Sequence, residues 1–426
     1  MEAPASPDEL LAGDSPHDPA TPWKLRFWSV FAGQALSLVG SSLTQFVLFW
    51  WITDTTGSIS ALATAGIVGL LPQALLGPLG GTFADRHSRR VIMAAADLIS
   101  AACMVVLIAL FMTGSVQLWH IFAMMFIRSA MQAFQQPAAA ASTAMLAPES
   151  FLTRAAGLNQ TLAGVITVAA APLGALAISV MPIGAALGID VATAVLGVAP
   201  LFYFAIPQAR VPVAGRPSLW REFREGVTTV WQDAGLRQIY GLLATVVLVI
   251  MPSFMLSPLL VKEYFGGGAP QVALLESLGG GGMVAGGILV AVLAPRRRAR
   301  WLLWGFALTC LTVALTALAP PHMFWLATFW WAVSGVTFTA GSAPLTALLQ
   351  TRVPNQLQGR VLSLLSTIMG LAAPVGLFLA TPLGELIGVR WLFVLVGLLG
   401  TAVMLLGFLS PHVRALDDDG SSVRET

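Results

Sequence analysis

Long apolar stretches, separated by short polar connections, occupy almost the whole of this 426-residue chain. Most reach or exceed the roughly 20 residues that an α-helix needs to cross the hydrocarbon core of a bilayer, and several are long enough to tilt. The pattern predicts an all-α membrane protein with twelve transmembrane helices, at about 26–53, 59–83, 91–113, 117–146, 156–180, 184–206, 236–261, 270–294, 301–319, 322–349, 361–382 and 386–410.

The composition excludes a soluble protein. Apolar residues make up 57% of the chain and charged residues only 10%, with a mean hydropathy of +0.81.

The two ends of the chain differ from the rest. Residues 1–22 are polar and acidic and lack a basic region followed by an apolar run, so we expect a disordered arm and not a signal peptide. We also expect residues 411–426, which contain three consecutive aspartates, to form a disordered tail.

The basic residues are distributed unequally between the two sides of the membrane. If the twelve spans alternate in direction, all of the 22 Lys and Arg residues except Arg128, Lys262 and Arg390 lie on the side of the termini or at its edge. The positive-inside rule therefore predicts a multi-pass plasma-membrane protein with both termini in the cytoplasm. The net charge of +2 gives no indication of a nucleic-acid partner.

One long internal connection, 207–235, is polar and falls near the middle of the chain. Its position predicts a cytoplasmic linker between two halves of six helices each. The boundaries that follow are a first half at 23–206 and a second half at 236–410.

The two halves contain an internal repeat. The segment Pro148–Arg154 recurs as Pro354–Arg360, at an offset of 206 residues, and two further matches follow in the same order at slightly smaller offsets. Because six spans are an even number, the repeat keeps its direction across the membrane. The halves are therefore expected to be parallel copies, with a substrate cavity between them.

A charged motif follows the second span, and it contains Gly81, Asp85, Arg86, Arg89 and Arg90. The arginines by themselves would fix the topology. Asp85 adds nothing to a positive-inside signal, however, and a carboxylate at this place can dock on the N-terminus of another helix, where unpaired amides and the dipole favour negative charge.

This motif resembles the signature loop G-x-x-x-D-R-x-G-R-R of the major facilitator superfamily, with Ser88 in place of one glycine. In that family the carboxylate docks on the eleventh span, which begins here near Gly359 and Arg360. The resemblance implies a conformational latch at Asp85 that holds the cytoplasmic side shut. The alternative is that the loop only fixes the topology.

Arg128 lies near the middle of the fourth span, and Gln132, Gln135 and Gln136 follow it at helical spacing. A charge within a span usually has a function and faces the protein interior or an aqueous cavity. The position resembles the fourth-span arginine motif that the superfamily associates with proton transfer, although the glycines that normally follow are missing. A purely structural salt bridge is an equal alternative.

Two aspartates are candidate counter-charges for Arg128. Asp190 lies in the sixth span and Asp97 early in the third. Asp97 lies nearer the cytoplasm, so an alternative is that it pairs with the arginines at 86–90. The sequence leaves this choice open. Both residues are candidates for proton coupling, together with Glu276 in the eighth span and the region of Asp85.

The first span carries a second polar face, formed by Gln34, Ser37, Ser41 and Gln45 at spacings of three and four residues. This spacing predicts a helix that lines a cavity, together with the glutamines of the fourth span. Aromatic and Met side chains such as Phe134 and Phe338 are candidates for the apolar part of the lining. For each of these aromatic residues, packing in the core or against lipid is the alternative.

The sequence provides no candidates for a catalytic group, a metal site or a cofactor. The five histidines have no ligand spacing, and the glycine-rich run at 279–282 lacks the Lys-Ser/Thr of a phosphate-binding loop. No other ATP-binding signature is present. Transport by this chain would therefore depend on an ion gradient.

Several segments resemble the Mef-type macrolide efflux proteins of the drug:proton antiporter group, among them Trp23–Leu25, Ala32–Leu38, Ala96–Leu98, Phe126–Ser129 and Gly359–Val361. The resemblance implies export of small amphipathic, macrolide-like drugs by proton antiport with alternating access. It also implies a monomer that acts in the lipid bilayer with substrate and protons as its partners. Alternatives are an exporter of siderophores or other metabolites with the same fold, and a transport-inactive sensor or scaffold.

Overall fold

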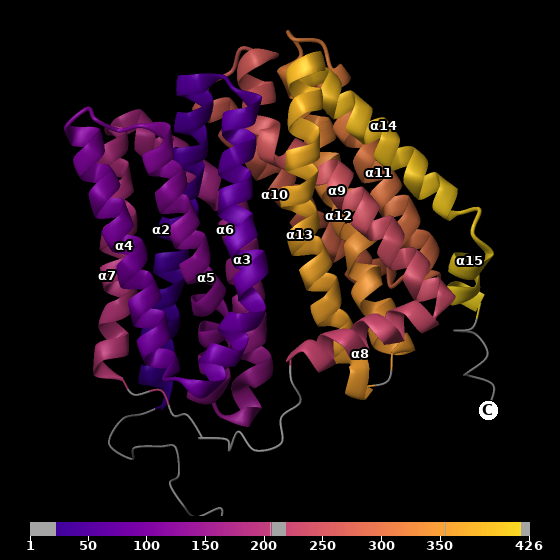
Figure 1. The fold of residues 1–426 in the computed structure, drawn as a ribbon, viewed down its shortest axis with the longest axis horizontal. Coiled ribbons are helices and arrows are strands. Elements are labelled where there is room, and N and C mark those ends of the chain that lie inside the picture. The colour runs from indigo at the N-terminus through magenta and orange to yellow at the C-terminus, as the bar shows by residue number, and fades with distance from the viewer. Residues whose placement is uncertain (1–22, 205, 207–218, 354, 419–426) are drawn as a thin grey trace, which may run out of the picture.

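The computed structural model describes residues 23–204, 206, 219–353 and 355–418, and all regular structure in these ranges is helical. Six long helices form a first bundle (Figure 1): α2 (Trp23–Thr56), α3 (Ile59–Arg86), α4 (Arg89–Met112), α5 (Leu118–Leu146), α6 (Glu149–Val180) and α7 (Ile183–Tyr203). Six more form a second bundle: α9 (Ala234–Glu263), α10 (Ala269–Leu293), α11 (Arg298–Leu318), α12 (Phe324–Arg352), α13 (Asn355–Ile387) and α14 (Val389–Gly407). Two shorter helices are α8 (Leu219–Gln232) and α15 (Pro411–Asp418).

Length and hydropathy identify eleven helices in the described ranges as candidate membrane spans. The remaining long helix, α5, has 29 residues but carries Arg128 and three glutamines, which lower its hydropathy. It packs against α3 and α4 inside the first bundle, where Arg128 and Gln135 are buried. The charge of α5 is thus enclosed by protein, and the helix completes a set of twelve.

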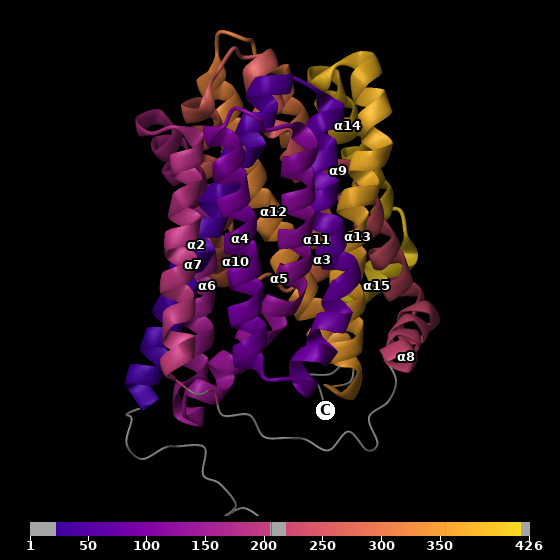
Figure 2. The same cartoon turned by 60° about the vertical axis from the view of Figure 1, so that its left-hand side comes forward.

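The two bundles lie side by side in Figure 1, and Figure 2 brings the first bundle in front of the second. They contact each other mainly through α3 with α13 and through α6 with α10. The ribbons approach each other at the end where α2 and α9 finish and diverge toward the end that carries α8 (Figure 1). The four helices α3, α6, α10 and α13, two from each bundle, make most of the contacts across the interface, and α2 and α9 add further ones.

Glycines let α10 and α12 approach each other with their backbones almost in contact. A Cβ added at Gly282 would lie 2.1 Å from the carbonyl oxygen of Ala332, and one added at Gly335 would lie 2.1 Å from that of Gly279. Small residues at such crossings permit close helix packing in membranes. The second bundle therefore has a seam that tolerates no side chain at these positions.

The C-terminal segment differs from the sequence-based expectation. Residues 411–418 form α15 and are not disordered, and the residues beyond lie outside the described part. Val413 and Leu416 are buried against the second bundle, and the backbone N–H groups of Ala299 and Arg300 donate to the Asp417 carboxylate at 2.8 and 3.1 Å. These contacts at the start of α11 stabilise a segment whose run of aspartates suggested disorder. The predicted arm at 1–22 lies outside the described residues.

Candidate functional site

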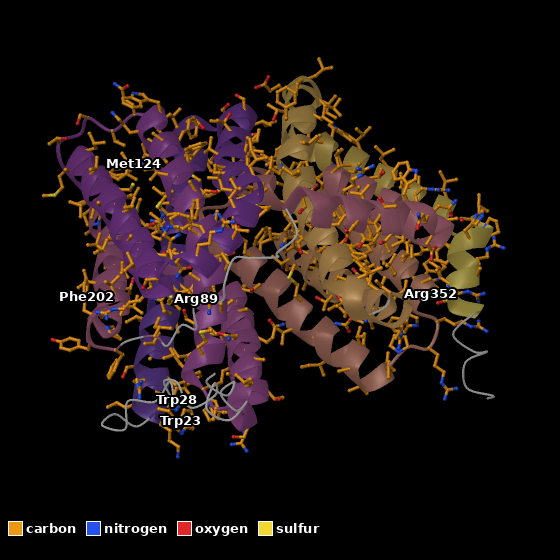
Figure 3. The ribbon with its side chains drawn as sticks, turned by 60° about the horizontal axis from the view of Figure 1, so that its bottom comes forward. Trp23, Trp28, Arg89, Met124, Phe202 and Arg352 are labelled. Atoms are coloured by element: carbon orange, nitrogen blue, oxygen red, sulfur yellow. The ribbon has the colours of Figure 1, made fainter. Side chains whose placement is uncertain are left out.

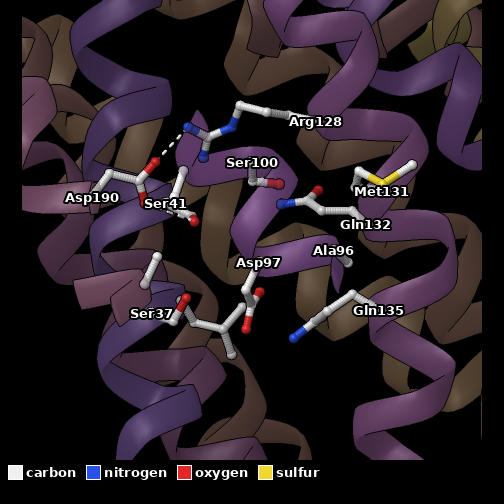
Figure 4. A pocket seen from close by; sticks show the side chains of 13 residues that line it. Ser37, Ser41, Ala96, Asp97, Ser100, Arg128, Met131, Gln132, Gln135 and Asp190 are labelled. Carbon is white, nitrogen blue, oxygen red and sulfur yellow. Dashed lines mark hydrogen bonds and ion pairs between the residues drawn. The ribbon is translucent and has the colours of Figure 1, made fainter. Parts of the chain in front are cut away.

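A buried ion pair joins α5 and α7 in the middle of the first bundle. The Arg128 guanidinium pairs with the Asp190 carboxylate (Figure 4), and the two residues are only 8% and 2% exposed. The Ser41 hydroxyl on α2 donates a second hydrogen bond to this carboxylate, at 3.0 Å, to its other oxygen. Burying two charges is costly, so a pair of this kind needs such additional hydrogen bonds. Of the two candidate counter-charges, Asp190 is the one that contacts Arg128.

Asp97 on α4 has a different partner. The side-chain amide of Gln34 donates to its carboxylate at 3.1 Å and to the backbone carbonyl of Gly197 at 3.3 Å. Gln135 on α5 then donates to the carbonyl oxygen of Gln34 at 2.7 Å. Asp97 is thus held by a chain of neutral amides. The structure does not join it to the arginines at 86–90.

The ion pair and Asp97 line the same small cavity, together with Ser37, Ser41 and Gln132 (Figure 4). Its volume is about 30 Å³, which accommodates about one or two water molecules but no drug. Four helices, α2, α4, α5 and α7, supply the lining. Polar residues predicted on separate spans therefore meet around one water-sized space.

The remaining polar residues predicted to line a cavity lie around this space. Gln45 lines a second small cavity, which it shares with Gln132 and Arg128. Gln136 accepts a hydrogen bond from Gln73 of α3 at 2.8 Å, and with Gln34 and Gln135 it lines a larger, mainly apolar cavity of about 310 Å³.

Phe134 and Phe338 line none of these cavities. Phe134 packs edge-to-face against Phe83, with ring centroids 5.7 Å apart. Phe338 packs against Phe254 and Phe306 at 6.1 and 5.7 Å. Both rings serve packing in this structure, which is the alternative that the sequence left open.

Another cavity, of about 240 Å³, lies between the two bundles. Helices α2 and α6 of the first bundle and α9 and α10 of the second supply its walls. Aromatic and other apolar side chains predominate, and the polar lining includes Ser42, Gln45, Thr167 and Glu276. Its lining thus comes from both halves of the chain.

A clamp closes the end of the interface where α2 and α9 finish. Lys262 of α9 lies 3.1 Å from the carboxylate of Asp54 and donates to the backbone carbonyls of Thr53 and Asp54 at 3.2 and 2.5 Å. These contacts join the second bundle to the first. Lys262 was an exception to the charge bias along the chain, and the clamp gives its position a structural reason.

Comparison with known families decides the identity of this architecture. The family model of the Major Facilitator Superfamily matches residues 30–376 and 242–422. The chain belongs to this superfamily. It is therefore a multi-pass membrane protein of a transporter family and not an enzyme, and the predicted all-α fold of twelve helices is confirmed.

Several proteins of this superfamily are similar in sequence to the chain. Macrolide efflux protein A of Streptococcus pyogenes is 33% identical over 398 residues, covering 93% of this chain and 98% of the relative. The protein of the same name from Enterococcus faecalis is 33% identical over 75% of this chain and its own full length. Multidrug efflux pump Tap of Mycolicibacterium fortuitum is 26% identical, covering 89% of this chain and 94% of the relative. The resemblance to Mef-type proteins is confirmed.

Solved structures of the superfamily share the fold. A mutant form of the nucleoside transporter NupG superimposes with a TM-score of 0.74 at 12% identity, covering 91% of this chain and 99% of that one. A bacterial homolog of the human lysosomal transporter Spinster gives a TM-score of 0.67 at 15% identity, covering 95% and 99%.

The superfamily signature loop lies at the end of the first bundle that Figure 3 brings forward. Arg89 donates to the carbonyl oxygen of Ala141 at 3.4 Å, and Arg90 donates to that of Phe202 at 2.7 Å. These two arginines thus tie α4 to α5 and α7. Gly81 lies on α3 and Arg86 is exposed at its end.

The side chains of Asp85 and Arg360 and the surroundings of Gly359 lie outside the described part, so the latch stays a prediction.

Sequence reasoning missed the clamp at Lys262. It named Glu276 as a candidate for proton coupling but did not place it in the cavity between the bundles. In both, the residues that meet come from opposite halves of the chain, and Lys262 and Asp54 lie 208 positions apart. The signal for the clamp was a basic residue that departs from the predicted distribution of charge between the two sides. The signal for the cavity was an acidic residue in an apolar stretch.

Proposed function

We propose that this protein is a secondary active transporter that exports small amphipathic, macrolide-like drugs across the cytoplasmic membrane in exchange for protons. The observation that carries the proposal is the buried group of Arg128, Asp190 and Asp97 around a water-sized cavity. Ionisable groups within spans are costly, and they mark ion and proton pathways in transporters. The relatives in sequence are macrolide and multidrug efflux proteins, which supports export as the direction.

Transport would proceed by alternating access, with 23–206 and 236–410 as two bodies joined by a cytoplasmic linker at 207–235. In our proposal both termini are cytoplasmic, so the clamp between Asp54 and Lys262 faces outward and the divergent end of the bundles faces the cytoplasm. The clamp must part when the protein opens outward. The chain would act as a monomer, because both halves of the cavity come from one chain.

Asp97 is our candidate for the proton-binding group. Asp190 is paired with a guanidinium, and protonating it would leave Arg128 without its counter-charge. In the described part of the chain Asp97 has no cationic partner and accepts its hydrogen bond from the neutral amide of Gln34. Protonation of Asp97 therefore breaks no ion pair, whereas protonation of Asp190 would. Asp190 would hold Arg128 in place beside it.

Asp85 would serve as the latch on the cytoplasmic side. When the cavity faces outward, its carboxylate would dock near Gly359 and Arg360 at the start of α13. The clamp at Lys262 and the latch at Asp85 would then close opposite ends of the same interface in alternation.

Drug-stimulated proton movement in inverted vesicles tests this function. The panel contains a macrolide, a cationic dye and an iron-chelating siderophore, with Asp97→Asn as the inactive variant and Glu385→Gln, an exposed acid on α13, as the matched control. We expect the macrolide or the dye to move protons in the wild type and the control but not in Asp97→Asn. A response to the siderophore alone would favour a metabolite exporter. Silence across the panel at normal expression would contradict proton antiport and favour a sensor or scaffold.

A further inference from the structure

The cavity between the two bundles contains a single charged side chain. Of the fourteen residues that line it, Glu276 of α10 is the one ionisable group. Placing an acidic side chain within a membrane span costs free energy, and such a residue is normally paired with a cation or a backbone dipole. Its presence in a mainly apolar wall without another charged group therefore requires a reason.

Within the described part of the chain, the Glu276 carboxylate has no hydrogen-bond or ion-pair partner. Asp190 in the first bundle is different, because Arg128 and Ser41 satisfy its two oxygens. The counter-charge of Glu276 is thus not supplied by the described protein. A positively charged molecule in the cavity would supply it.

The packing of α10 directs this carboxylate toward the other bundle. Gly280 lies one turn after Glu276 on the same helix face, and a Cβ at Gly280 would lie 2.8 Å from the backbone carbonyl of Thr167 on α6. The face that carries both residues is therefore the one in contact with the first bundle. Glu276 and Thr167 line the cavity from opposite sides of the interface.

Aromatic rings form much of the remaining wall. Phe46, Phe49 and Trp50 come from α2, and Phe254 comes from α9. Phe254 is itself held by Trp331 behind it, with ring centroids 5.1 Å apart. Aromatic faces attract organic cations, and Trp does so most strongly. The wall thus combines a negative charge with surfaces that suit a lipophilic cation.

The size of the cavity restricts what it can hold. Its volume of about 240 Å³ is slightly below the range of about 300–1,000 Å³ for drug-sized pockets. It therefore accommodates a small cation or the charged end of a larger amphipathic molecule, whose remainder would lie along the interface.

We propose that this cavity binds the positively charged group of an organic cation, with Glu276 as the counter-charge and Trp50 and Phe254 as its walls. The inference rests on the proposed transport function and adds the substrate class: amphipathic molecules that carry a protonated amine or a quaternary centre. Neutral molecules of similar shape lack the interaction with Glu276.

Binding of tetraphenylphosphonium to the purified full-length protein in lipid nanodiscs tests the proposal. Wild type, Glu276→Gln and the exposed control Glu385→Gln are compared by isothermal titration calorimetry. We expect Glu276→Gln to weaken binding roughly 10- to 100-fold, the effect of removing one charge-assisted contact, and Glu385→Gln to bind as the wild type. Equal affinity in Glu276→Gln and the wild type would overturn the proposal.

A second variant and a second ligand separate loss of charge from loss of fold. Glu276→Asp keeps the charge, so we expect it to bind the cation more tightly than Glu276→Gln. Triphenylphosphine oxide is neutral, and its affinity should be the same in all variants. If Glu276→Gln loses the neutral ligand as well, or if Glu276→Asp binds as weakly as Glu276→Gln, the carboxylate is not a cation site.

The same variants distinguish this inference from the proposed function. Cation binding that depends on Glu276, in a protein without drug-stimulated proton movement, would support the site and contradict proton antiport. Proton movement driven by a cationic dye and unchanged in Glu276→Gln would support antiport and overturn the site.

Discussion

Lys262 at the end of α9 reaches across the interface to Asp54 at the end of α2, where its Nζ lies 3.1 Å from the carboxylate. The same ammonium group donates to the backbone carbonyls of Thr53 and Asp54. The two side chains are 29% and 60% exposed. An ion pair this accessible contributes about 0.2–1 kcal/mol. A contact this weak suits the alternating access that we propose, in which it forms and breaks.

Removal of the clamp should shift the protein toward the state with its outer end open. We expect Lys262→Gln to raise the population of that state by about fivefold at most, which corresponds to about 1 kcal/mol. Spin labels at Thr55→Cys and Pro270→Cys report the opening as a longer distance in double electron–electron resonance. The native Cys103 and Cys310 are buried, so they should label poorly.

Arg390→Gln is the matched control for the clamp. It removes another basic residue from the same end of the protein, but Arg390 stacks on Tyr264 and Trp391 within the second bundle. The distance distribution between the spin labels in Arg390→Gln should match that of the labelled protein without this substitution. An equal shift in both variants would mean that the charge on this surface matters and the clamp does not.

Breaking the buried pair on one side should destabilise the first bundle. Arg128→Gln or Asp190→Asn alone leaves an uncompensated charge, and we expect each to cost about 3–5 kcal/mol. The double variant leaves no such charge and should recover part of this stability. Thermal unfolding in detergent measures the series, and a double variant less stable than both single ones would contradict the pairing.

The same double variant separates a structural role from a transport role. If the pair only supports the fold, transport should return with stability. We expect transport to stay lost, because the pair lies beside Asp97 in the cavity that the proposed proton pathway uses.

Asp97→Asn should uncouple transport from protons without preventing substrate movement. The amide keeps most of the volume of the side chain and a hydrogen bond to Gln34, but it cannot take up a proton. We expect drug exchange between two sides at equal pH to continue, while accumulation driven by a pH gradient is lost. Radiolabelled drug uptake into inverted vesicles measures both. Gradient-driven accumulation at the wild-type level would remove Asp97 from the coupling.

The glycine seam between α10 and α12 gives a matched pair of substitutions. A Cβ at Gly282 would lie 2.1 Å from the carbonyl oxygen of Ala332, whereas one at Gly281 meets nothing within 4 Å. We expect Gly282→Ala to destabilise the protein by about 1–3 kcal/mol through overpacking. Gly281→Ala should be neutral or stabilising by up to about 1 kcal/mol, since Ala favours the helix. Equal melting temperatures for the two variants would contradict the close approach.

The fold was largely predictable because each span must pair its own backbone N–H and C=O groups within the hydrocarbon core of the bilayer. An apolar stretch of sufficient length has few alternatives to a transmembrane helix. Even α5 was identified, since its charge lies among apolar residues over 29 positions. The helix α15 was missed because Val413 and Leu416 are stabilised by a distant part of the chain, which a local pattern does not contain.

The sequence identified many of the polar residues of the candidate site, but it did not identify which of them contact each other. Helical spacing identified the polar faces of α2 and α5, because a face is a local property. The choice of Asp190 over Asp97 as the partner of Arg128 depends on how α5 packs against α4 and α7. The cavity at Glu276 requires four helices from both halves to meet, and no periodicity along the chain encodes that arrangement.

Glu276 lies on the second bundle, whereas Asp97 and Asp190 lie on the first. In our proposals a substrate cation and a proton therefore do not compete for one shared carboxylate. Each influences the other only through the equilibrium between the two conformations, and thermodynamic linkage makes that influence mutual. Loss of one acid would then change the stoichiometry or the tightness of coupling, and need not abolish the passage of the other ligand.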